Sequence, residues 1–300
     1  MTTRFYRSTD EGAPVLSPQP GSFNALLRAC LVDGYAAKQP AGWALSYDNE
    51  SGINIFQPSE GNRHYLLVND TTTTTAALTG TEGVDADGNA TAPFGTYYIG
   101  KHVTAAAQSA NWVIVADETA ALIFTESAPV TAPGAYGAAF FGTLIGGGST
   151  DTFNTLITGS TAASTSGALK TTPGDAVATG AIGFSANACG VLARATGDSP
   201  SGGTPAFSSG AGGMTRQSGS TAWASPLANG DISLTALYAF EGSAAGTGRG
   251  RIPFLWAIRN GLVVNLFPGF TDVGLGRILI RQGTTLTDAA TSGAVIVETQ

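Results

Sequence analysis

The chain has 300 residues, of which 43% are hydrophobic and 12% charged, with a formal net charge of −7. This length and apolar content can support one large domain or two smaller ones. The sequence contains three lysines. Because clustered positive charge supplies most of the affinity for phosphate backbones, we expect no nucleic-acid partner. The 41 glycines and the many Ala, Ser and Thr residues favour strands and turns over solvated helices.

Neither a membrane span nor a secretory leader is predicted. No stretch reaches the roughly 18 consecutive apolar residues that a spanning helix needs, and Met1–Arg7 has no apolar leader core. We therefore expect synthesis in the cytoplasm and no membrane partner. The two cysteines, Cys30 and Cys189, are too few for a disulfide framework, so both are predicted to be small buried residues.

The chain is predicted to begin with an extended arm followed by one helix. Three prolines in residues 1–21 disfavour regular structure, and arms of this kind often lie on a neighbouring subunit. From Ser22 the apolar residues recur at helical spacing, which predicts a helix over about residues 22–33. Ser22 is expected to be its N-cap, and Gly34 is expected to end it. The apolar stripe consists of Phe23, Leu26, Leu27, Cys30 and Leu31.

After the helix, the hydrophobic pattern becomes strand-like. The segment from Trp112 to Phe124 is predicted to be a hairpin, and Asn260-Gly261 is predicted to be a tight type I′ turn between two strands. We therefore expect a mainly β fold, with antiparallel sandwich or barrel-like lobes. The predicted strands are 53–57, 64–69, 96–102, 111–116, 120–126, 136–145, 153–158, 232–240, 251–258, 262–267, 277–281 and 294–298.

Composition divides the chain into two predicted β lobes. Residues 22–160 form the first, with the helix, and residues 181–300 form the second. The Thr-, Ala-, Ser- and Gly-rich residues 161–180 are the expected linker. The Gly/Ser-rich residues 196–222 are predicted to be a long loop that is either mobile or ordered by another chain.

Two glycine-rich fragments resemble nucleotide-binding motifs, but neither predicts a site. Gly95–His102 has phosphate-loop spacing, yet His102 replaces the hydroxyl residue that would hold Mg²⁺, and the fragment is predicted to be a strand. Gly246–Gly250 lacks the strand-to-helix setting of a dinucleotide fingerprint and is interpreted as a turn. We therefore expect no cofactor.

Metal binding has little support in the sequence. Asp85, Asp87 and Asn89 alternate around a glycine, as Ca²⁺ ligands do, but the distal glutamate and the flanking helices are missing. An ordinary turn stabilised by Asp85 is the expected alternative to a weak Ca²⁺ site. The two histidines, His64 and His102, are too few for a usual zinc site or a serine–histidine triad. No metal ligand is assigned.

No catalytic residue is assigned either. A glycosidase needs two carboxylates, but Asp48 and Glu50, like Asp117 and Glu118, lie at turn-like positions where acids commonly cap backbone donors. The chain is therefore predicted not to be an enzyme.

The arginines of the C-terminal third leave two interpretations open. They form one locally basic face for an acidic protein partner, or they are scattered side chains that face solvent. These arginines are Arg194, Arg216, Arg249, Arg251, Arg259, Arg277 and Arg281.

Several segments of the chain resemble, in the same order, a group of structural proteins from tailed-bacteriophage particles. The likeness covers roughly the first half and the tail of the chain, whereas Thr71–Thr75 and residues 196–222 match nothing in that group. The group has no catalytic motif to transfer. The segments are Arg4–Asp10, Ala13–Leu16, Leu26–Tyr35, Lys38–Trp43, Tyr65–Asp70, Trp112–Asp117 and Phe141-Gly142.

The resemblance implies a non-enzymatic part of a virion, assembled in several copies in the tail or the head-to-tail region. Its partners would be copies of itself and other virion proteins. A capsid decoration or cement protein is one alternative. A tail adhesin that binds a host receptor or surface glycan is another, motivated by Trp223, Tyr238 and Trp256, and a polymer hydrolase is the least supported.

Overall fold

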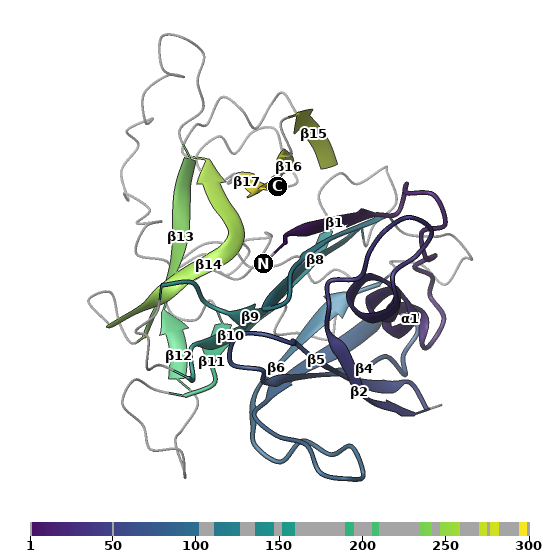
Figure 1. The fold of residues 1–300 in the computed structure, drawn as a ribbon, viewed down its shortest axis with the longest axis horizontal. Coiled ribbons are helices and arrows are strands. Elements are labelled where there is room, and N and C mark those ends of the chain that lie inside the picture. The colour runs from purple at the N-terminus through teal and green to yellow at the C-terminus, as the bar shows by residue number, and fades with distance from the viewer. Residues whose placement is uncertain are drawn as a thin grey trace.

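The computed structural model describes residues 2–49, 51–101, 111–126, 136–146, 152–159, 190–194, 206–209, 234–241, 247–258, 270–274, 277–281 and 294–298. Within these ranges the fold is mainly antiparallel β with one short helical segment, which confirms the predicted fold class (Figure 1). The elements are β1 (Arg4–Arg7), α1 (Ser22–Arg28) with a π-helical continuation (Ala29–Asp33), β2 (Ala44–Asn49), β3 (Ile53–Gln57), β4 (Tyr65–Asn69), β5 (Thr75–Thr81), β6 (Pro93–Gly100), β7 (Trp112–Ala116), β8 (Ala120–Glu126), β9 (Tyr136–Thr143), β10 (Thr155–Thr158), β11 (Gly190–Leu192), β12 (Ala206–Ser209), β13 (Leu234–Glu241), β14 (Thr247–Ile258), β15 (Phe270–Gly274), β16 (Arg277–Arg281) and β17 (Ala294–Glu298).

The described strands form two sheets. The smaller one is a meander in the order β2-β3-β4-β5-β6. The larger one has the order β1-β7-β8-β9-β10-β11-β12-β13-β14-β17-β16-β15. Strand β6 of the smaller sheet contacts β8, β9, β10 and β11 of the larger sheet, so the two sheets pack against each other where β6 crosses these four strands.

The apolar pattern of the strands explains how they are buried. In β4, Leu66 and Val68 are buried while their neighbours are partly exposed, as expected for a strand with one face on a core. All five residues of β7 are buried, and that strand is a continuous apolar run in the sequence. The antiparallel pairing of β7 with β8 confirms the predicted Trp112–Phe124 hairpin.

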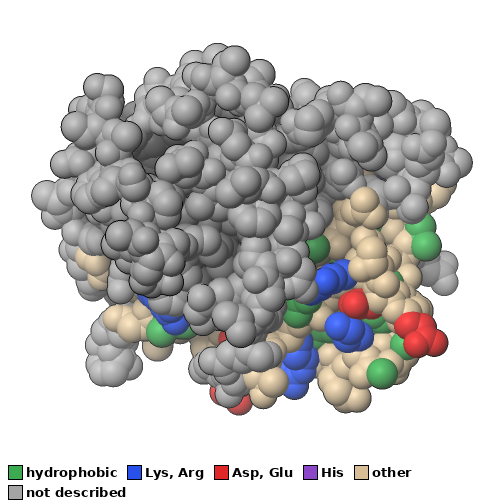
Figure 2. Space-filling model, turned by 90° about the horizontal axis from the view of Figure 1, so that it is seen from above, with side chains coloured by type: hydrophobic (Ala, Val, Ile, Leu, Met, Phe, Trp, Pro, Cys, Tyr) green, Lys and Arg blue, Asp and Glu red, His purple; other side chains and the backbone are tan. Residues whose placement is uncertain are grey.

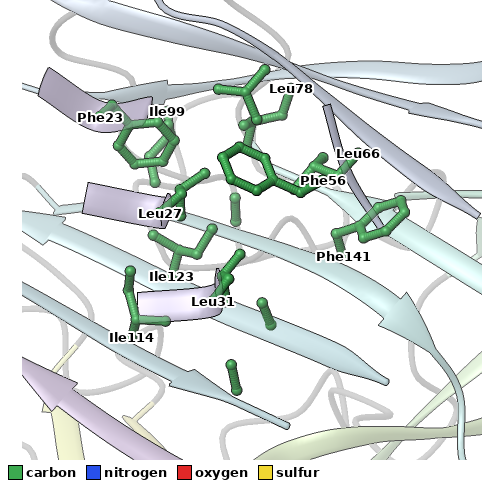
Figure 3. Close-up of a cluster of buried hydrophobic side chains, with 14 of the residues drawn as sticks. Phe23, Leu27, Leu31, Phe56, Leu66, Leu78, Ile99, Ile114, Ile123 and Phe141 are labelled. Carbon is green, nitrogen blue, oxygen red and sulfur yellow. The ribbon is translucent and has the colours of Figure 1, made fainter. Parts of the chain in front are cut away.

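The core lies between the two sheets and is closed at one end by the helical segment. Phe23, Leu27 and Leu31 project from the helix toward side chains of both sheets (Figure 3). All three are fully buried, so the predicted helical stripe is confirmed as core. Their labelled neighbours are Phe56, Leu66, Leu78 and Ile99 of the smaller sheet and Ile114, Ile123 and Phe141 of the larger sheet.

The predicted N-terminal arm lies against its own chain. Strand β1 pairs with β7 in a ladder that runs from Arg4 opposite Ala116 to Arg7 opposite Val113. Leu16 is fully buried in the core. The Trp112 indole N–H also donates to the Pro14 carbonyl at 3.0 Å. Strand pairing and a buried leucine therefore attach this segment to the domain.

The larger sheet passes through the predicted boundary between the lobes. Residues 160–189, which include the predicted 161–180 linker, lie outside the described residues. On either side of that range, β10 pairs directly with β11, Leu156 lying opposite Leu192. Strand β12 falls inside the predicted 196–222 loop and pairs with β11 and β13. Residues 206–209 of this segment are therefore paired with strands of their own chain.

Other expectations differ in detail. Thr247–Gly250, interpreted as a turn, begins the long strand β14, because this segment pairs with β13. The fragment Gly95–His102, which has phosphate-loop spacing, was predicted to be a strand, and β6 confirms this for its residues up to Gly100. The Asn260-Gly261 turn lies outside the described residues. No helix in the described part of the chain is both long and apolar enough to span a membrane.

Candidate functional site

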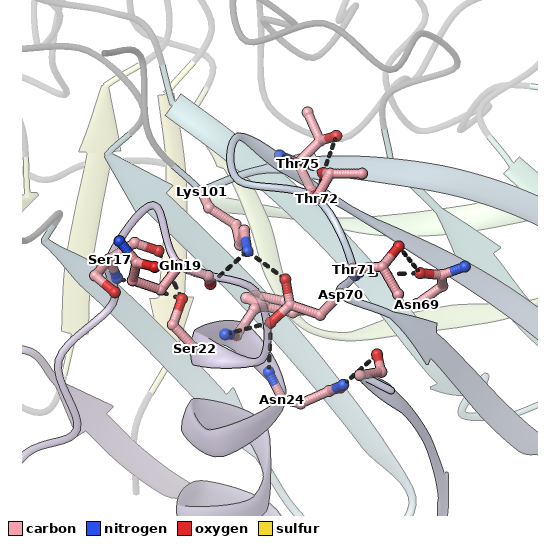
Figure 4. A network of polar contacts seen from close by, with 12 residues as sticks. Ser17, Gln19, Ser22, Asn24, Asn69, Asp70, Thr71, Thr72, Thr75 and Lys101 are labelled. Carbon is pink, nitrogen blue, oxygen red and sulfur yellow. Dashed lines mark hydrogen bonds and ion pairs between the residues drawn. The ribbon is translucent and has the colours of Figure 1, made fainter. Parts of the chain in front are cut away.

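A buried ion pair joins the smaller sheet to the start of the helix. The Lys101 ammonium contacts Oδ1 of Asp70, and both side chains have zero exposure to solvent (Figure 4). Oδ2 of Asp70 accepts backbone hydrogen bonds from Phe23 at 2.7 Å and Asn24 at 3.2 Å. Lys101 also donates to the Gln19 carbonyl at 3.0 Å. We call Asp70, Lys101 and these three partners the latch.

The sheet topology brings Asp70 and Lys101 together. Strands β4 and β6 lie on either side of β5 and are antiparallel to it, so they run in the same direction. Asp70 directly follows β4, and Lys101 directly follows β6, so both residues emerge at the same edge of the sheet. The Lys101 amide also donates to the Thr74 carbonyl at 2.7 Å, which fixes the end of β6.

The charges of Asp70 and Lys101 can be buried because each has partners. Burial raises the pKa of the Asp70 carboxyl, while the Lys101 ammonium and the two helix amides act in the opposite direction. A carboxylate at the N-terminal end of a helix satisfies amides that have no partner within the helix. Two charges removed from water persist only when each is paired and hydrogen-bonded, as here.

The latch corrects the predicted helix cap. Gly21, not Ser22, is the N-cap residue. The Ser22 hydroxyl donates backward to the Ser17 carbonyl at 2.6 Å and is therefore occupied. The capping carboxylate comes from Asp70, and no local pattern indicates a partner so distant in sequence. Gly34 does follow the helical segment, with a φ of 79° as predicted for a glycine stop.

A second polar cluster lies between the two sheets, around His64. The His64 ring is 7% exposed and its Nδ1 lies 2.8 Å from the Thr155 hydroxyl. The ring stacks on Phe153 with 6.2 Å between the centroids. The side-chain nitrogen Nδ2 of Asn62 donates to Thr155 Oγ1 at 3.1 Å and to Asn154 Oδ1 at 2.7 Å. We call these five residues the His64 cluster.

Arg194 adjoins the His64 cluster and links it to both sheets. Its guanidinium forms a two-pronged ion pair with Glu82 and lies 4.4 Å from the centroid of the Phe153 ring. Its carbonyl accepts a hydrogen bond from Arg249 at 2.8 Å. Arg194 is 8% exposed and Arg249 is 1% exposed. The expectation that the arginines face solvent is wrong for these two, because both are held by partners inside the fold.

The remaining arginines of that set are described less fully. Arg251 is half-buried in β14. Arg277 and Arg281 are described only as strand positions, and two further arginines lie outside the described residues. The choice between one basic face and scattered arginines that face solvent is therefore not decided. The two undescribed ones are Arg216 and Arg259.

Because His64 is buried, we expect the folded chain to lose stability in acid. Burial, with a smaller contribution from Arg194, lowers the pKa of His64 from 6.5 to about 4, while Glu82 acts in the opposite direction. Between these two pH values the unfolded chain binds a proton that the folded chain does not, so stability falls as the pH falls. A pKa shift of this size lowers the free energy of unfolding by at most about 3 kcal/mol, and this loss is complete near pH 4.

Urea unfolding measured at pH 7 and at pH 4.5 checks this expectation. His64→Gln keeps a polar group next to Thr155 but does not titrate, so its loss of stability between the two pH values should be smaller by about 2 kcal/mol. Equal losses in the wild type and the variant would contradict the assignment to His64.

The predicted Asp85–Asn89 turn is ordered by its own hydrogen bonds. Asp85 Oδ1 accepts from the amides of Asp87 at 3.0 Å and Asn89 at 2.8 Å. The hydrogen bond from the Asn89 side-chain amide, together with these backbone bonds, lowers the pKa of the Asp85 carboxyl. Within the described residues, no group of three or more His, Cys, Asp or Glu side chains is arranged to hold a metal ion. The hydrogen bonds of Asp85 are those of the ordinary turn that was named as the alternative to a weak Ca²⁺ site.

The acids considered as a catalytic pair have structural contacts. Asp117 Oδ1 accepts from the Thr119 and Ala120 amides in the turn between β7 and β8, as expected of a capping acid. Glu118 pairs with Arg4 at 3.1 Å. Asp48 pairs with Arg28 across the exposed surface at 3.0 Å. Glu50 lies outside the described residues.

The remaining candidate residues are placed as follows. Cys30 is a free, fully buried cysteine, as predicted. Tyr238 lies opposite Arg251 and Trp256 lies opposite Ala236 in the β13–β14 pair, and both are described only as backbone. The undescribed candidates are His102, Cys189 and Trp223.

The described surface mixes charges of both signs. On the face shown in Figure 2, basic and acidic side chains lie beside one another among uncharged groups. The ion pairs Arg4–Glu118 and Lys38–Asp10 illustrate this arrangement.

No known protein-family model matches the chain, and no curated protein sequence matches it.

Proposed function

We propose that the chain is a non-enzymatic structural component of a tailed-bacteriophage virion, assembled in several copies in the tail or the head-to-tail region. One observation carries the proposal. The separate segments that resemble phage particle proteins contact one another around the core of the described fold. A resemblance that follows one physical unit is stronger support than the same number of scattered matches.

The contacts between these segments are direct. Arg4–Arg7 forms β1 and pairs with β7, which is part of the segment Trp112–Asp117. The segment Tyr65–Asp70 supplies the aspartate that caps the helix. Trp43 meets the edge of Phe141, with 6.1 Å between the ring centroids. Strand, helix and loop segments therefore meet around one core.

The polar groups support a structural role rather than a chemical one. His64 has its Nδ1 on Thr155 and its ring on Phe153, and Asp70 is neutralised by Lys101. These titratable groups are almost fully buried, so a polymer substrate has no access to them in this conformation. Their contacts join the sheets and the helix to one another, as expected of groups that hold a fold together.

Quantitative mass spectrometry of purified particles tests the proposal. Heads and tails are separated, and the copy number of this chain is compared with those of the portal and major capsid proteins. We expect a defined multiple of the tail or connector symmetry in the tail fraction. Many copies in the head fraction would identify a decoration or cement protein instead. Particles without this chain would overturn the virion proposal.

A further inference from the structure

The latch places an amine and a carboxyl group in contact inside a dry core. Both Asp70 and Lys101 have zero side-chain exposure, and the Lys101 nitrogen contacts Oδ1 of the carboxyl group. We propose that these two side chains condense to an intramolecular isopeptide bond, releasing one molecule of water. This inference does not depend on the proposed function.

The two oxygens of Asp70 have different surroundings, and this difference suits the reaction. Oδ1 contacts the lysine nitrogen, whereas Oδ2 accepts the amides of Phe23 at 2.7 Å and Asn24 at 3.2 Å. Amide donors fixed on one oxygen of a carboxyl group stabilise the negative charge that develops there when the carbon is attacked. The Gln19 carbonyl accepts a lysine hydrogen at 3.0 Å and so helps to orient the nitrogen.

The reaction balances without an outside reagent. A proton passes from the Lys101 ammonium to the Asp70 carboxylate, giving a neutral amine and a neutral acid. The amine lone pair forms a bond to Cγ, and Oδ2 carries the charge of the tetrahedral intermediate. Oδ1 then leaves as water, taking one hydrogen from the nitrogen and the one it already holds. The product is a secondary amide.

Burial favours each stage of this condensation. It raises the pKa of the Asp70 carboxyl, which favours the neutral acid that the attack requires. Fixed neighbouring groups react as one molecule rather than two, which removes much of the entropic barrier. Because the pair has no contact with solvent, water that leaves is not readily replaced, and the amide is protected from hydrolysis.

Intact-mass measurement of the purified full chain under denaturing conditions tests the proposal. We expect a mass lower than that of the sequence by one water molecule. The denatured protein is then cut after aromatic residues between the two partners, such as Phe94 and Tyr97. We expect a branched product in which the peptides that contain Asp70 and Lys101 remain joined. Trypsin should not cut after Lys101.

Two controls separate this bond from other losses of water. An aspartate before glycine can lose water as a cyclic imide, and Asp33-Gly34 and Asp87-Gly88 are such sites; mild alkali restores that water but leaves an isopeptide intact. Lys101→Arg should have the full mass of its own sequence. If this variant does not fold, the peptide map of the wild type still decides. Separate peptides carrying Asp70 and Lys101 would overturn the proposal.

Discussion

Lys101→Met is expected to destabilise the fold by about 3 to 5 kcal/mol, because it leaves the Asp70 carboxylate in the core without its counter-charge. Asp70→Asn should cost a similar amount, because the lysine is then buried without a carboxylate and the helix amides lose a charged acceptor. Chemical denaturation monitored by tryptophan fluorescence measures both losses.

The double variant Asp70→Asn/Lys101→Met is the control. It removes both charges and leaves two side chains of similar size, with the Asn oxygen still able to accept from the helix. We expect its loss to be smaller than the sum of the single losses by about 2 to 3 kcal/mol. Strictly additive losses would show that the two side chains act independently.

The second large effect is expected at Gly142, which lies within β9. Its φ is 156°, and a Cβ atom there would lie 2.3 Å from the Ala120 Cβ and 2.8 Å from the Thr119 carbonyl oxygen. Gly142→Ala must therefore displace the backbone of the adjoining strand β8. Overpacking and backbone strain together predict a loss of about 3 to 5 kcal/mol in the same denaturation measurement.

Gly146→Ala is the matched control. Gly146 also has a positive φ, 78°, but a Cβ atom there meets nothing within 4 Å. Its substitution carries the backbone cost alone, about 1 to 2 kcal/mol. Equal losses at Gly142 and Gly146 would contradict the assigned collision with β8.

Local periodicity predicts much of this fold and fails where tertiary contacts decide. Strands β3, β8, β16 and β17 have the predicted bounds, because their apolar and β-branched runs are bordered by turn residues. Strand β2 was not predicted, because its side chains are exposed or only partly buried and leave no clear apolar pattern. Strands β1, β5, β11, β12 and β15 were also missed, and several of them are rich in Gly, Ala, Ser or Thr.

The polar sites were less predictable than the strands. His64 enters the sequence-based prediction only as one of two histidines, too few for a zinc site or a serine–histidine triad, and its partner Thr155 lies 91 positions away in sequence. Asp70 and Lys101 are separated in sequence by the antiparallel strands β5 and β6, and neither belongs to a local motif. Buried polar pairs of this kind depend on strand order, which periodicity does not specify.

The pairing of β1 with β7 also bears on how the chain folds. Arg4 lies opposite Ala116, so the first strand has no ladder partner until more than a hundred residues have left the ribosome. Closing so long a loop costs conformational entropy before any hydrogen bond of this ladder forms. Strand β1 is thus synthesised well before its partner β7 and cannot pair with it until the intervening strands have been made.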